Sequence, residues 1–484
     1  MLALLLTLGS ALASPAELYG FGAAAMGRSG GGIALSGDAG SALLNPAALA
    51  GHDRSQLLLG YSVVRFDFDD VPAVYWDTNR DGLIDEHDEP LNLGGYDPGD
   101  GLMLGLRRPI GRRFGVGGAM FIPQQRLLRL QTTDPQLPNY FMYRNRTQRY
   151  ALAIGFGGMP VRSLYVGGGF RILSKSVIDV TMTIDAVVDG GGTEGGVEDV
   201  VGLEARVHDM SFDLKPAVVP VLGLRWDVGE VVEPLKGLAL AFTWRNEGGI
   251  PVDVNLDAQL NVRAEDLGEL DPVSMAALAQ VYVSIYDHYM PMQFIGGGAW
   301  SHQDAFHVYV DAHFTRWSAM RLNSTELVSS ELNATMADLS DLEFENGHDV
   351  GEIQWKDTWS VRTGTEVNLR RFELPGRLGW VRPSLRGGFG YEPTPLVAQS
   401  GHTALLDADR MIFGLGASLS HGAIWDVCEG PVRWDIFLQY HSLASGTLAR
   451  PETSEPRPGY AVDGQPVPIG GRFLATGLQW SFDY

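Results

Sequence analysis

Residues 474–484 alternate between an apolar set and a small or polar set up to the last residue of the chain. The first set is Leu474, Thr476, Leu478, Trp480, Phe482 and Tyr484, and the second is Ala475, Gly477, Gln479, Ser481 and Asp483. A period of two indicates a β-strand with one apolar face. A closed barrel in a bilayer pairs its last strand with its first and turns that face to lipid. We therefore expect a transmembrane β-barrel.

The same alternation recurs upstream and predicts fourteen antiparallel strands, an even number as in bacterial single-chain barrels. The expected strands lie near 56–68, 99–108, 114–131, 148–158, 163–186, 200–226, 236–262, 290–301, 305–317, 353–369, 378–392, 409–421, 432–445 and 470–484. Short links such as 108–113 and 159–162 alternate with long ones such as 69–98, 263–289 and 318–352. This asymmetry is typical of short periplasmic turns and long extracellular loops, and it places both barrel ends on the periplasmic side.

A secreted β-sandwich is the alternative fold, because its strands also alternate and bury one face against a second sheet. Aromatic residues at the strand ends and the strand at the C-terminus favour the barrel. The 61 glycines and the 10% aromatic content fit strands with small lumen positions and aromatic girdles.

The net charge argues against certain binding partners, and the cysteine content excludes an intrachain disulfide. The 58 acidic and 36 basic residues give a net charge of −22, which argues against nucleic acid and anionic lipid as partners. Cys428 is the single cysteine, so no intrachain disulfide can form. Residues 1–16 resemble an export signal peptide with Ala11, Leu12 and Ala13 as an A-x-A cleavage site. No later stretch approaches the roughly 18 apolar residues of a membrane helix.

Residues 17–55 differ from the rest, since they are rich in Gly and Ala and lack a strand pattern. A lumen of this strand number is wider than side chains alone can fill. We therefore expect this segment to lie inside the barrel as a plug, with residues 56–484 forming the barrel and its loops.

Several motifs resemble the FadL/OmpP1/TodX family of outer-membrane transporters of hydrophobic compounds. The matching residues are Gly22, Gly27, Arg28, Ser29, Asp38, Ala39, Asn45, Pro46 and Ala47, and downstream the stretches 315–318, 385–395 and 406–410. The resemblance implies an N-terminal hatch built around Phe21, Gly27, Arg28, Asp38, Asn45, Pro46 and Ala47. It also implies passive transport of long-chain fatty acids or similar hydrophobic compounds across the outer membrane of a Gram-negative bacterium.

Expected partners are a hydrophobic small molecule, outer-membrane lipid and lipopolysaccharide, and the barrel-assembly machinery through the C-terminal strand; we expect a monomer. In the resembled family a kink in the third strand opens a lateral gap, which here implies an exit near Gly117, Gly118 and Pro123. An ordinary proline at the barrel rim is the alternative.

Residues 77–88 carry oxygen donors at the spacing of a calcium-binding loop, with Gly82 at the sharp turn. The expected Ca²⁺ ligands are Asp77, Asn79, Asp81, Asp85 and Asp88 with the carbonyl of Leu83, and the alternative is an acidic solvated turn. We expect a structural ion that fixes the first long loop.

Other residues are weaker candidates for ligand contacts. Apolar residues recur at helical spacing within 275–289, which predicts a loop helix that packs on the barrel mouth or captures ligand through Tyr282 and Tyr286. Arg171 and Arg245 face inward in the predicted register and could meet a carboxylate. His307, Asp311 and His313 share an inward face, which we interpret as lumen polarity.

Three other functions remain open at this stage: uptake of aromatic hydrocarbons, an outer-membrane lipase, and a structural or adhesive calcium-binding barrel. Residues 27–31 fit G-x-S-x-G but lack the strand–turn–helix setting, and no serine has a base evident from the sequence. We therefore expect a transporter, not an enzyme.

Overall fold

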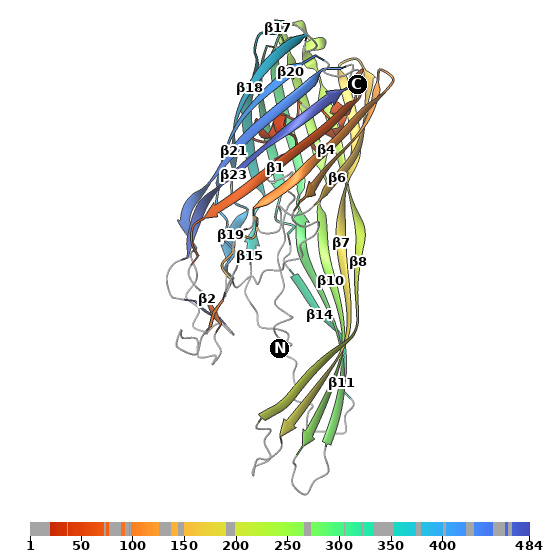
Figure 1. Ribbon diagram of the computed structural model, residues 1–484, viewed down its shortest axis with the longest axis vertical. Coiled ribbons are helices and arrows are strands. Elements are labelled where there is room, and N and C mark those ends of the chain that lie inside the picture. The colour runs from red at the N-terminus through yellow and green to blue at the C-terminus, as the bar shows by residue number, and fades with distance from the viewer. Residues whose placement is uncertain are drawn as a thin grey trace.

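Fourteen antiparallel strands close into a barrel in the computed structural model (Figure 1). The structure describes residues 20–484 except 36, 72–73, 77–88, 92–95, 97, 125–136, 144–149, 190–198, 266–272, 304, 321–322, 333–352, 374–378, 400–402, 423–429, 449–459 and 463–466. The predicted all-β class and strand number are confirmed.

The wall consists of strands that each pair with two neighbours around the ring. They are β1 (Gln56–Phe68), β4 (Gly99–Ile110), β5 (Phe114–Pro123), β6 (Ala151–Val161), β7 (Leu164–Asp189), β8 (Asp199–Trp226), β9 (Leu238–Arg245), β12 (Met292–His302), β13 (Phe306–Arg316), β16 (Thr358–Asn368), β18 (Trp380–Glu392), β20 (Arg410–His421), β21 (Val432–Thr447) and β23 (Pro468–Asp483). β1 closes the ring by pairing with β23, from Gln56 opposite Asp483 to Phe68 opposite Gly471.

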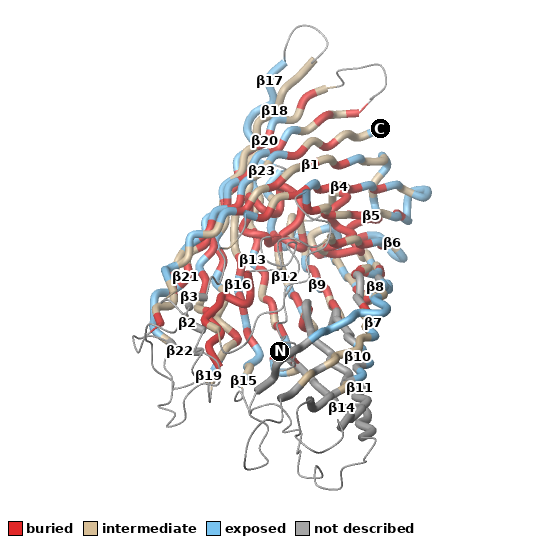
Figure 2. Tube along the Cα trace, turned by 60° about the horizontal axis from the view of Figure 1, so that its bottom comes forward, coloured by how far each residue is buried: buried red, intermediate tan, exposed pale blue. Residues whose placement is uncertain are grey.

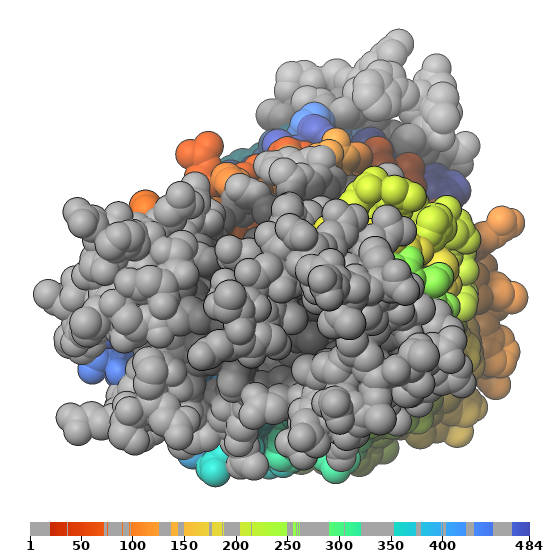
Figure 3. Space-filling view, turned by 90° about the horizontal axis from the view of Figure 1, so that it is seen from below, coloured from red at the N-terminus to blue at the C-terminus, as the bar shows by residue number. Residues whose placement is uncertain are grey.

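Connections at the two ends of the barrel differ in length. Short links such as 111–113 and 162–163 lie at the end where the C-terminus is found. The link 227–237 at that end carries two short 3₁₀ helices, η4 (Val228–Glu230) and η5 (Glu233–Leu235). At the opposite end, which Figure 3 views face on, successive wall strands are joined by longer connections, such as residues 69–98 between β1 and β4.

The barrel strands alternate between exposed and buried residues (Figure 2). On β20 the outward Phe413 and Leu415 are 46% and 62% exposed, whereas Ile412 between two outward positions is buried. Apolar side chains that face outward all round a closed barrel form the belt that meets hydrocarbon. The protein is therefore an outer-membrane barrel of the Gram-negative type. Among the described residues, no helix has the length and apolar character needed to cross a membrane.

A second group of strands extends the sheet beyond the barrel wall. β10 (Gly248–Glu265) pairs in parallel with β7, β11 (Val273–Met290) pairs with β10, and β14 (Asn323–Leu332) pairs with β11. Together with the far halves of β7 and β8 they form an extension sheet that projects from the loop end (Figure 1).

The extension sheet corrects two predictions. The strand expected at 236–262 is two strands, β9 in the wall and β10 in the extension. The pairing of β10 with β11 shifts its register between Ile250 and Pro251. The helix expected within 275–289 is wrong, because that segment is β11. Its β-branched and aromatic residues suit a strand, and β10 and β14 supply backbone partners on both sides.

Shorter elements complete the description. The strand expected at 353–369 is divided into β15 (Ile353–Trp355) and β16, and β15 pairs with β19 (Leu396–Gln399). β2 (Val74–Trp76) pairs with both β3 (Glu89–Leu91) and β22 (Tyr460–Val462), and β17 (Phe372–Glu373) pairs with β18. β5 ends at Pro123, earlier than the predicted 131, and residues 125–136 lie outside the described part.

Residues 20–35 and 37–55, here called the inner segment, lie within the bore (Figure 1). The segment contains α2 (Ala23–Met26), α3 (Ser41–Leu44) and the 3₁₀ helix η2 (Pro46–Leu49). Each helix has only four residues, too few to be stable alone. Its conformation must therefore be stabilised by the wall around it.

An arginine at Leu415 tests the lipid-facing belt. Because this side chain is 62% exposed on the outer face of β20, Leu415→Arg should lower the free energy of unfolding by about 2–4 kcal/mol in lipid vesicles. Urea titration followed by tryptophan fluorescence measures the change. Val231→Arg, in the turn after η4, is the matched control and should cost no more than about 0.5 kcal/mol. Equal costs at the two positions would contradict the assigned belt.

Candidate functional site

A row of four glycines on the inner wall receives residues 45–50 of the inner segment. Gly115, Gly157, Gly167 and Gly223 are in-register neighbours across β5, β6, β7 and β8. A Cβ at Gly167 would lie 2.3 Å from the Ala47 nitrogen, and one at Gly223 would lie 2.1 Å from Asn45 Oδ1. Backbone touches backbone here, so a side chain at any of these positions would displace the segment.

A second glycine row receives residues 27–29 on the opposite side of the ring. Gly388 of β18 and Gly414 of β20 are in-register neighbours and contact the segment, whereas Gly364 of β16, the next glycine in the row, lies against Tyr309. A Cβ at Gly388 would lie 2.6 Å from the carbonyl carbon of Arg28, and one at Gly414 would lie 2.5 Å from the Ser29 nitrogen. The inner segment therefore spans the bore between two opposed seats.

Inward polar side chains satisfy the backbone of the inner segment between these seats. Asp311 Oδ2 accepts from the amides of Gly32 (2.5 Å) and Ile33 (3.2 Å), and Gln479 Oε1 accepts from Ala23 (2.7 Å). Donated bonds run from Gln439 Nε2 to Met26 O (2.6 Å), from Arg362 Nη1 to Gly30 O (3.1 Å), from Arg245 Nη2 to Leu43 O (3.2 Å), and from Arg107 to Gly37 O. Buried backbone groups need such partners, so the wall replaces the water that an isolated segment would bind.

An ion-pair chain joins the segment to the wall. Arg28 contacts Glu366 at 2.7 Å, and Glu366 also contacts Arg386 at 3.0 Å. Arg386 then pairs with Asp435 at 2.8 Å, and Asp435 with Arg433 at 2.9 Å. Because Glu366 is shared between Arg28 and Arg386, removing it would leave two buried cations less well paired.

The residues expected in the hatch all take part in this packing. Asn45 caps η2 by accepting from the Ala47 amide at 3.2 Å, and its Nδ2 donates to Leu224 O of β8 at 3.1 Å. Pro46 and Ala47 lie over the first glycine row. The others are Phe21, buried in the apolar core, Gly27 against Gly416, Arg28 on Glu366, and Asp38, which accepts from the Gly40 amide.

Other predicted residues have different surroundings. Gly117 faces Leu49, whereas Gly118 lies on the other face of β5. Among the described residues, Pro123 pairs with Gly101 of β4 and has no partner on β6. The lateral exit stays a prediction. Arg171 is buried and donates to Met290 Sδ at 3.6 Å. The ligand role predicted for Arg171 and Arg245 also stays a prediction, although Arg245 contacts the inner segment.

The remaining predictions fall outside the described part. The whole calcium loop, with Asp77, Asn79, Asp81, Leu83, Asp85 and Asp88, lies outside the described residues, and so does residue range 1–19 with the expected signal peptide. The backbone of Tyr282 and Tyr286 belongs to β11, but their side chains are not described. Among the described residues, no cluster of three His, Cys, Asp or Glu could hold a metal ion.

Residues 137–143, here called the mouth segment, fold inward between β5 and β6. Asn139 forms a bridge with Leu405, and Tyr140 donates through its hydroxyl to Gly470 O at 2.7 Å. Burial raises the pKa of Tyr140 to about 12, so its phenol stays neutral and keeps donating. Below this segment lies a cavity of about 70 Å³. That space holds a few water molecules, and it is less than half of the 150 Å³ that accommodates benzene.

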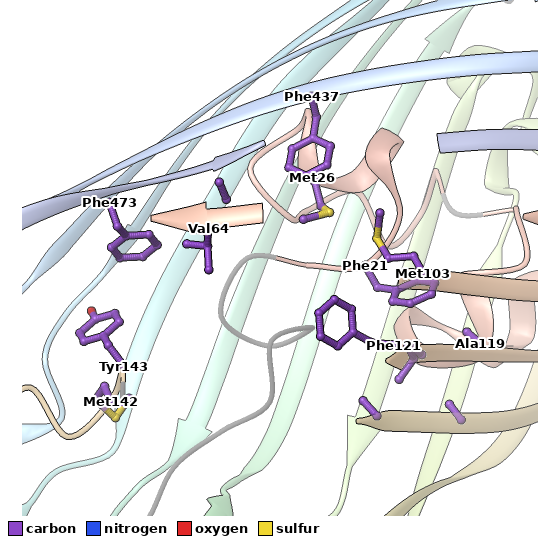
Figure 4. Close-up of a cluster of buried hydrophobic side chains, with 14 of the residues drawn as sticks. Phe21, Met26, Val64, Met103, Ala119, Phe121, Met142, Tyr143, Phe437 and Phe473 are labelled. Atoms are coloured by element: carbon purple, nitrogen blue, oxygen red, sulfur yellow. The ribbon is translucent and has the colours of Figure 1, made fainter. Parts of the chain in front are cut away.

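One apolar cluster connects the mouth segment with the inner segment. Figure 4 shows Met142 and Tyr143 beside Phe473 and Val64, and Met103, Phe121, Phe21 and Met26 farther along. The rings of Tyr143 and Phe473 have centroids 5.4 Å apart. Methionine and aromatic side chains adapt easily to apolar ligands. The cluster therefore offers a continuous hydrophobic contact from the mouth to the two seats.

Comparisons with known proteins agree with this architecture. No family model matches the sequence, and no curated protein matches it. A solved structure of a Pseudomonas aeruginosa FadL homologue aligns with a TM-score of 0.56 at 13% identity, covering 96% of this chain and 98% of that one. This chain has the fold of that FadL homologue.

Two further solved structures are similar over nearly their full length. The Pseudomonas putida toluene transporter TodX is 13% identical with a TM-score of 0.47, covering 96% of this chain and 99% of that chain. The Ralstonia pickettii toluene transporter TbuX is 14% identical with a TM-score of 0.45, with the same coverage. The fold expected from the resemblance is confirmed by the structure of the FadL homologue.

The glycine rows and Asp311 were not recognised in the sequence as parts of this site. The signal is present, because Gly115, Gly157, Gly167 and Gly223 all fall on inward positions of predicted strands. In the sequence, each of these glycines is typical of a small residue that faces the lumen. Only the strand register places the four side by side, where together they receive residues 45–50.

Substitution of Gly388 tests the second seat. Gly388→Ala places a methyl group 2.6 Å from the Arg28 carbonyl carbon, which should displace residues 27–29 at a cost of about 1–3 kcal/mol. The expected result is trypsin cleavage after Arg28 in folded, detergent-solubilised protein, where the wild type resists. Gly296→Ala is the control, since nothing lies within 4 Å of its added Cβ. Resistance of the Gly388→Ala variant would contradict the seat.

His52 gives the inner segment a pH dependence. Burial first, and Arg107 second, lower the pKa of His52 from 6.5 to about 4, and its Nε2 lies 3.0 Å from Ala48 O. The unfolded chain then binds the proton more readily, so this stabilisation is complete above pH 6.5 and is lost as the pH falls towards 4. Relative to His52→Gln, the wild type should lose up to about 3 kcal/mol of unfolding free energy over that window. Parallel urea titrations at pH 7.5 and about pH 4 measure it, and an equal response of the two proteins would contradict the burial of His52.

Proposed function

We propose that this protein carries hydrophobic compounds, most plainly long-chain fatty acids, passively across the outer membrane, with uptake of aromatic hydrocarbons as the alternative substrate class. The observation that carries the proposal is the apolar cluster that leads from the mouth segment to the inner segment. A water-filled pore offers a hydrophobic molecule no favourable contact, whereas a continuous row of apolar side chains does. Because the inner segment spans the bore between the two seats, passage of a ligand requires this segment to shift.

The inward side chains that hydrogen-bond the inner segment, here called the polar anchors, allow this segment to move without unfolding of the barrel. Hydrogen bonds such as that from Asn45 to Leu224 O can exchange for water, since each contributes only about 0.5–1.5 kcal/mol net. The glycine rows present backbone with no Cβ to residues 45–50, so the side chains that pack against the wall here, such as Leu49 and Pro46, belong to the inner segment. We propose that the inner segment acts as a hatch and that apolar ligand bound at Met26 and Phe21 favours its displaced position. Release through the wall near Pro123 is part of the same proposal.

The fold likeness supports this function over the alternatives, because a solved structure that shares the fold is that of a FadL homologue. A fatty acid has a longer apolar tail than toluene, and the cluster is elongated along the wall (Figure 4). This shape favours the fatty acid as substrate. An enzyme of the lipase type would need a nucleophile within hydrogen-bond reach of a base. Passive transport needs no such pair.

A reversible lock on the inner segment tests the proposal. A Cβ at Gly105 would lie 2.9 Å from the Ala39 Cβ, close to the roughly 3.5–4.5 Å that a disulfide needs. In an uptake-deficient host, the Ala39→Cys, Gly105→Cys pair in a Cys428→Ser background should take up labelled oleate when reduced. Oxidation should lower the rate about tenfold or more, and dithiothreitol should restore it.

The single variants Ala39→Cys and Gly105→Cys control for oxidation itself. Labelled toluene is tested in parallel, and faster uptake of toluene than oleate would favour the aromatic alternative. Uptake of neither compound above empty-vector cells would contradict the function. Unchanged uptake with the disulfide closed would contradict the moving hatch alone.

A further inference from the structure

The β7–β8 hairpin leaves the barrel wall and continues far beyond it. The last wall partners are Leu152 of β6 for Ile172, and Arg245 of β9 for Val221. From there β7 runs on to Asp189 and β8 begins at Asp199. At about 3.3 Å per residue this free part is roughly 50 Å long. The wall part of β7, from Leu164 to Ile172, is roughly 26 Å long at the same rise. That length matches the apolar band of an outer-membrane barrel, which is about 25 Å tall, so we place the extension beyond the hydrocarbon layer.

One face of this extension continues the lipid-facing side of the barrel. In the wall, the outward positions of the hairpin include Phe170, 51% exposed, and Leu222, 53% exposed. The same side of the pleat carries Ile178 opposite Phe212 and Val180 opposite Met210 in the extension. Phe212 and Met210 are 45% and 65% exposed, although they lie beyond the bilayer.

A β-bulge keeps this face apolar. The register shifts between Thr181 and Met182, so that Met182 pairs with Val207 and not with His208. A shift by one residue moves every later side chain of β8 to the other face. It places Val207, 58% exposed, on the apolar side. Without the shift His208 would interrupt that side.

The opposite face is polar and internally hydrogen-bonded. Asp179 accepts from Asn255 of β10 at 2.5 Å and from Ser211 of β8 at 3.2 Å. Farther along, Asp185 accepts from Asn261 at 2.8 Å. Solvated carboxylate and amide groups need no further partner. The extension is thus an amphipathic sheet. Its polar face is well solvated by water, whereas exposure of its apolar face to water is unfavourable.

We propose that the apolar face of the β7–β8 extension binds the surface of a hydrocarbon droplet outside the cell. The face is continuous with the belt that already contacts acyl chains, and its described positions carry no charge: Ile178, Val180, Met182, Ile184, Ala205, Val207, Met210, Phe212, Pro216 and Val218. An exposed apolar row of this length matches an extended liquid apolar surface, which can adapt to the shape of the face. Binding to the droplet would bring a source of hydrophobic compound close to the barrel mouth. Only this benefit of droplet binding, and not the binding itself, rests on the proposed function.

Droplet flotation tests the proposal. Wild-type protein in lipid nanodiscs, which occupy the barrel belt, is mixed with hexadecane droplets and centrifuged; empty nanodiscs are the blank. The wild type should float with the droplets. Met210→Lys with Phe212→Lys should lower the bound fraction about tenfold or more. Thr181→Lys with Ser211→Lys adds the same charge to the polar face and should float like the wild type. Mobility shifts on heating confirm that each barrel is folded.

Three outcomes would overturn the proposal: no flotation of the wild type, equal flotation of both double variants, or pairing of nanodiscs that Met210→Lys with Phe212→Lys abolishes. The last would assign the face to a second copy of the chain. Uptake of dissolved oleate is measured separately in cells. Both double variants should keep oleate uptake. If the wild type takes up no oleate, the proposed function is contradicted, but the proposed binding to droplets is not.

Discussion

Direct contact between the backbone of the inner segment and the backbone of the barrel wall is the constraint on which this structure depends. Gly167 and Gly223 on one side and Gly388 and Gly414 on the other leave no space for a Cβ. A wall of ordinary side chains would hold the segment several ångströms farther in, away from the groups that bond it. The glycines thereby set the position of a chain that has no stable helices of its own.

The seats and the polar anchors work together. The seats bring backbone amides and carbonyls within reach of inward side chains such as Asp311, Gln439 and Gln479, and these side chains satisfy buried groups that water no longer reaches. Most of these bonds are to backbone, so the sequence of the segment is free to be small and apolar. Small residues in turn allow the close approach. Beside the anchors, the apolar cluster extends from the mouth segment to the inner segment, and smaller apolar clusters lie around Ile33 and around Leu173.

The fold was predictable because strand alternation in a barrel is a local property. Residues 474–484 and 305–317 predict their strands and their outward faces from the sequence alone. The prediction for residues 275–289 was wrong because apolar residues at helical spacing also fit a strand. Pairing with β10 and β14 decides for the strand, and the pattern within 275–289 does not reveal that pairing. The site was predictable in part. Asn45 and Arg28 were recognised, but the glycine rows and Asp311 depend on register, which no single segment reveals.

Hydrogen exchange of the inner segment is the most direct measurement of the central claim. The amides of Gly32, Ile33 and Ala23 donate to Asp311 and Gln479 of the wall. In folded wild-type protein these amides should exchange as slowly as those of the neighbouring barrel strands, because they open only when the segment leaves its seats. Exchange at the rate of an unstructured peptide would contradict the account, since the bore would then hold a loose chain in place of a seated one.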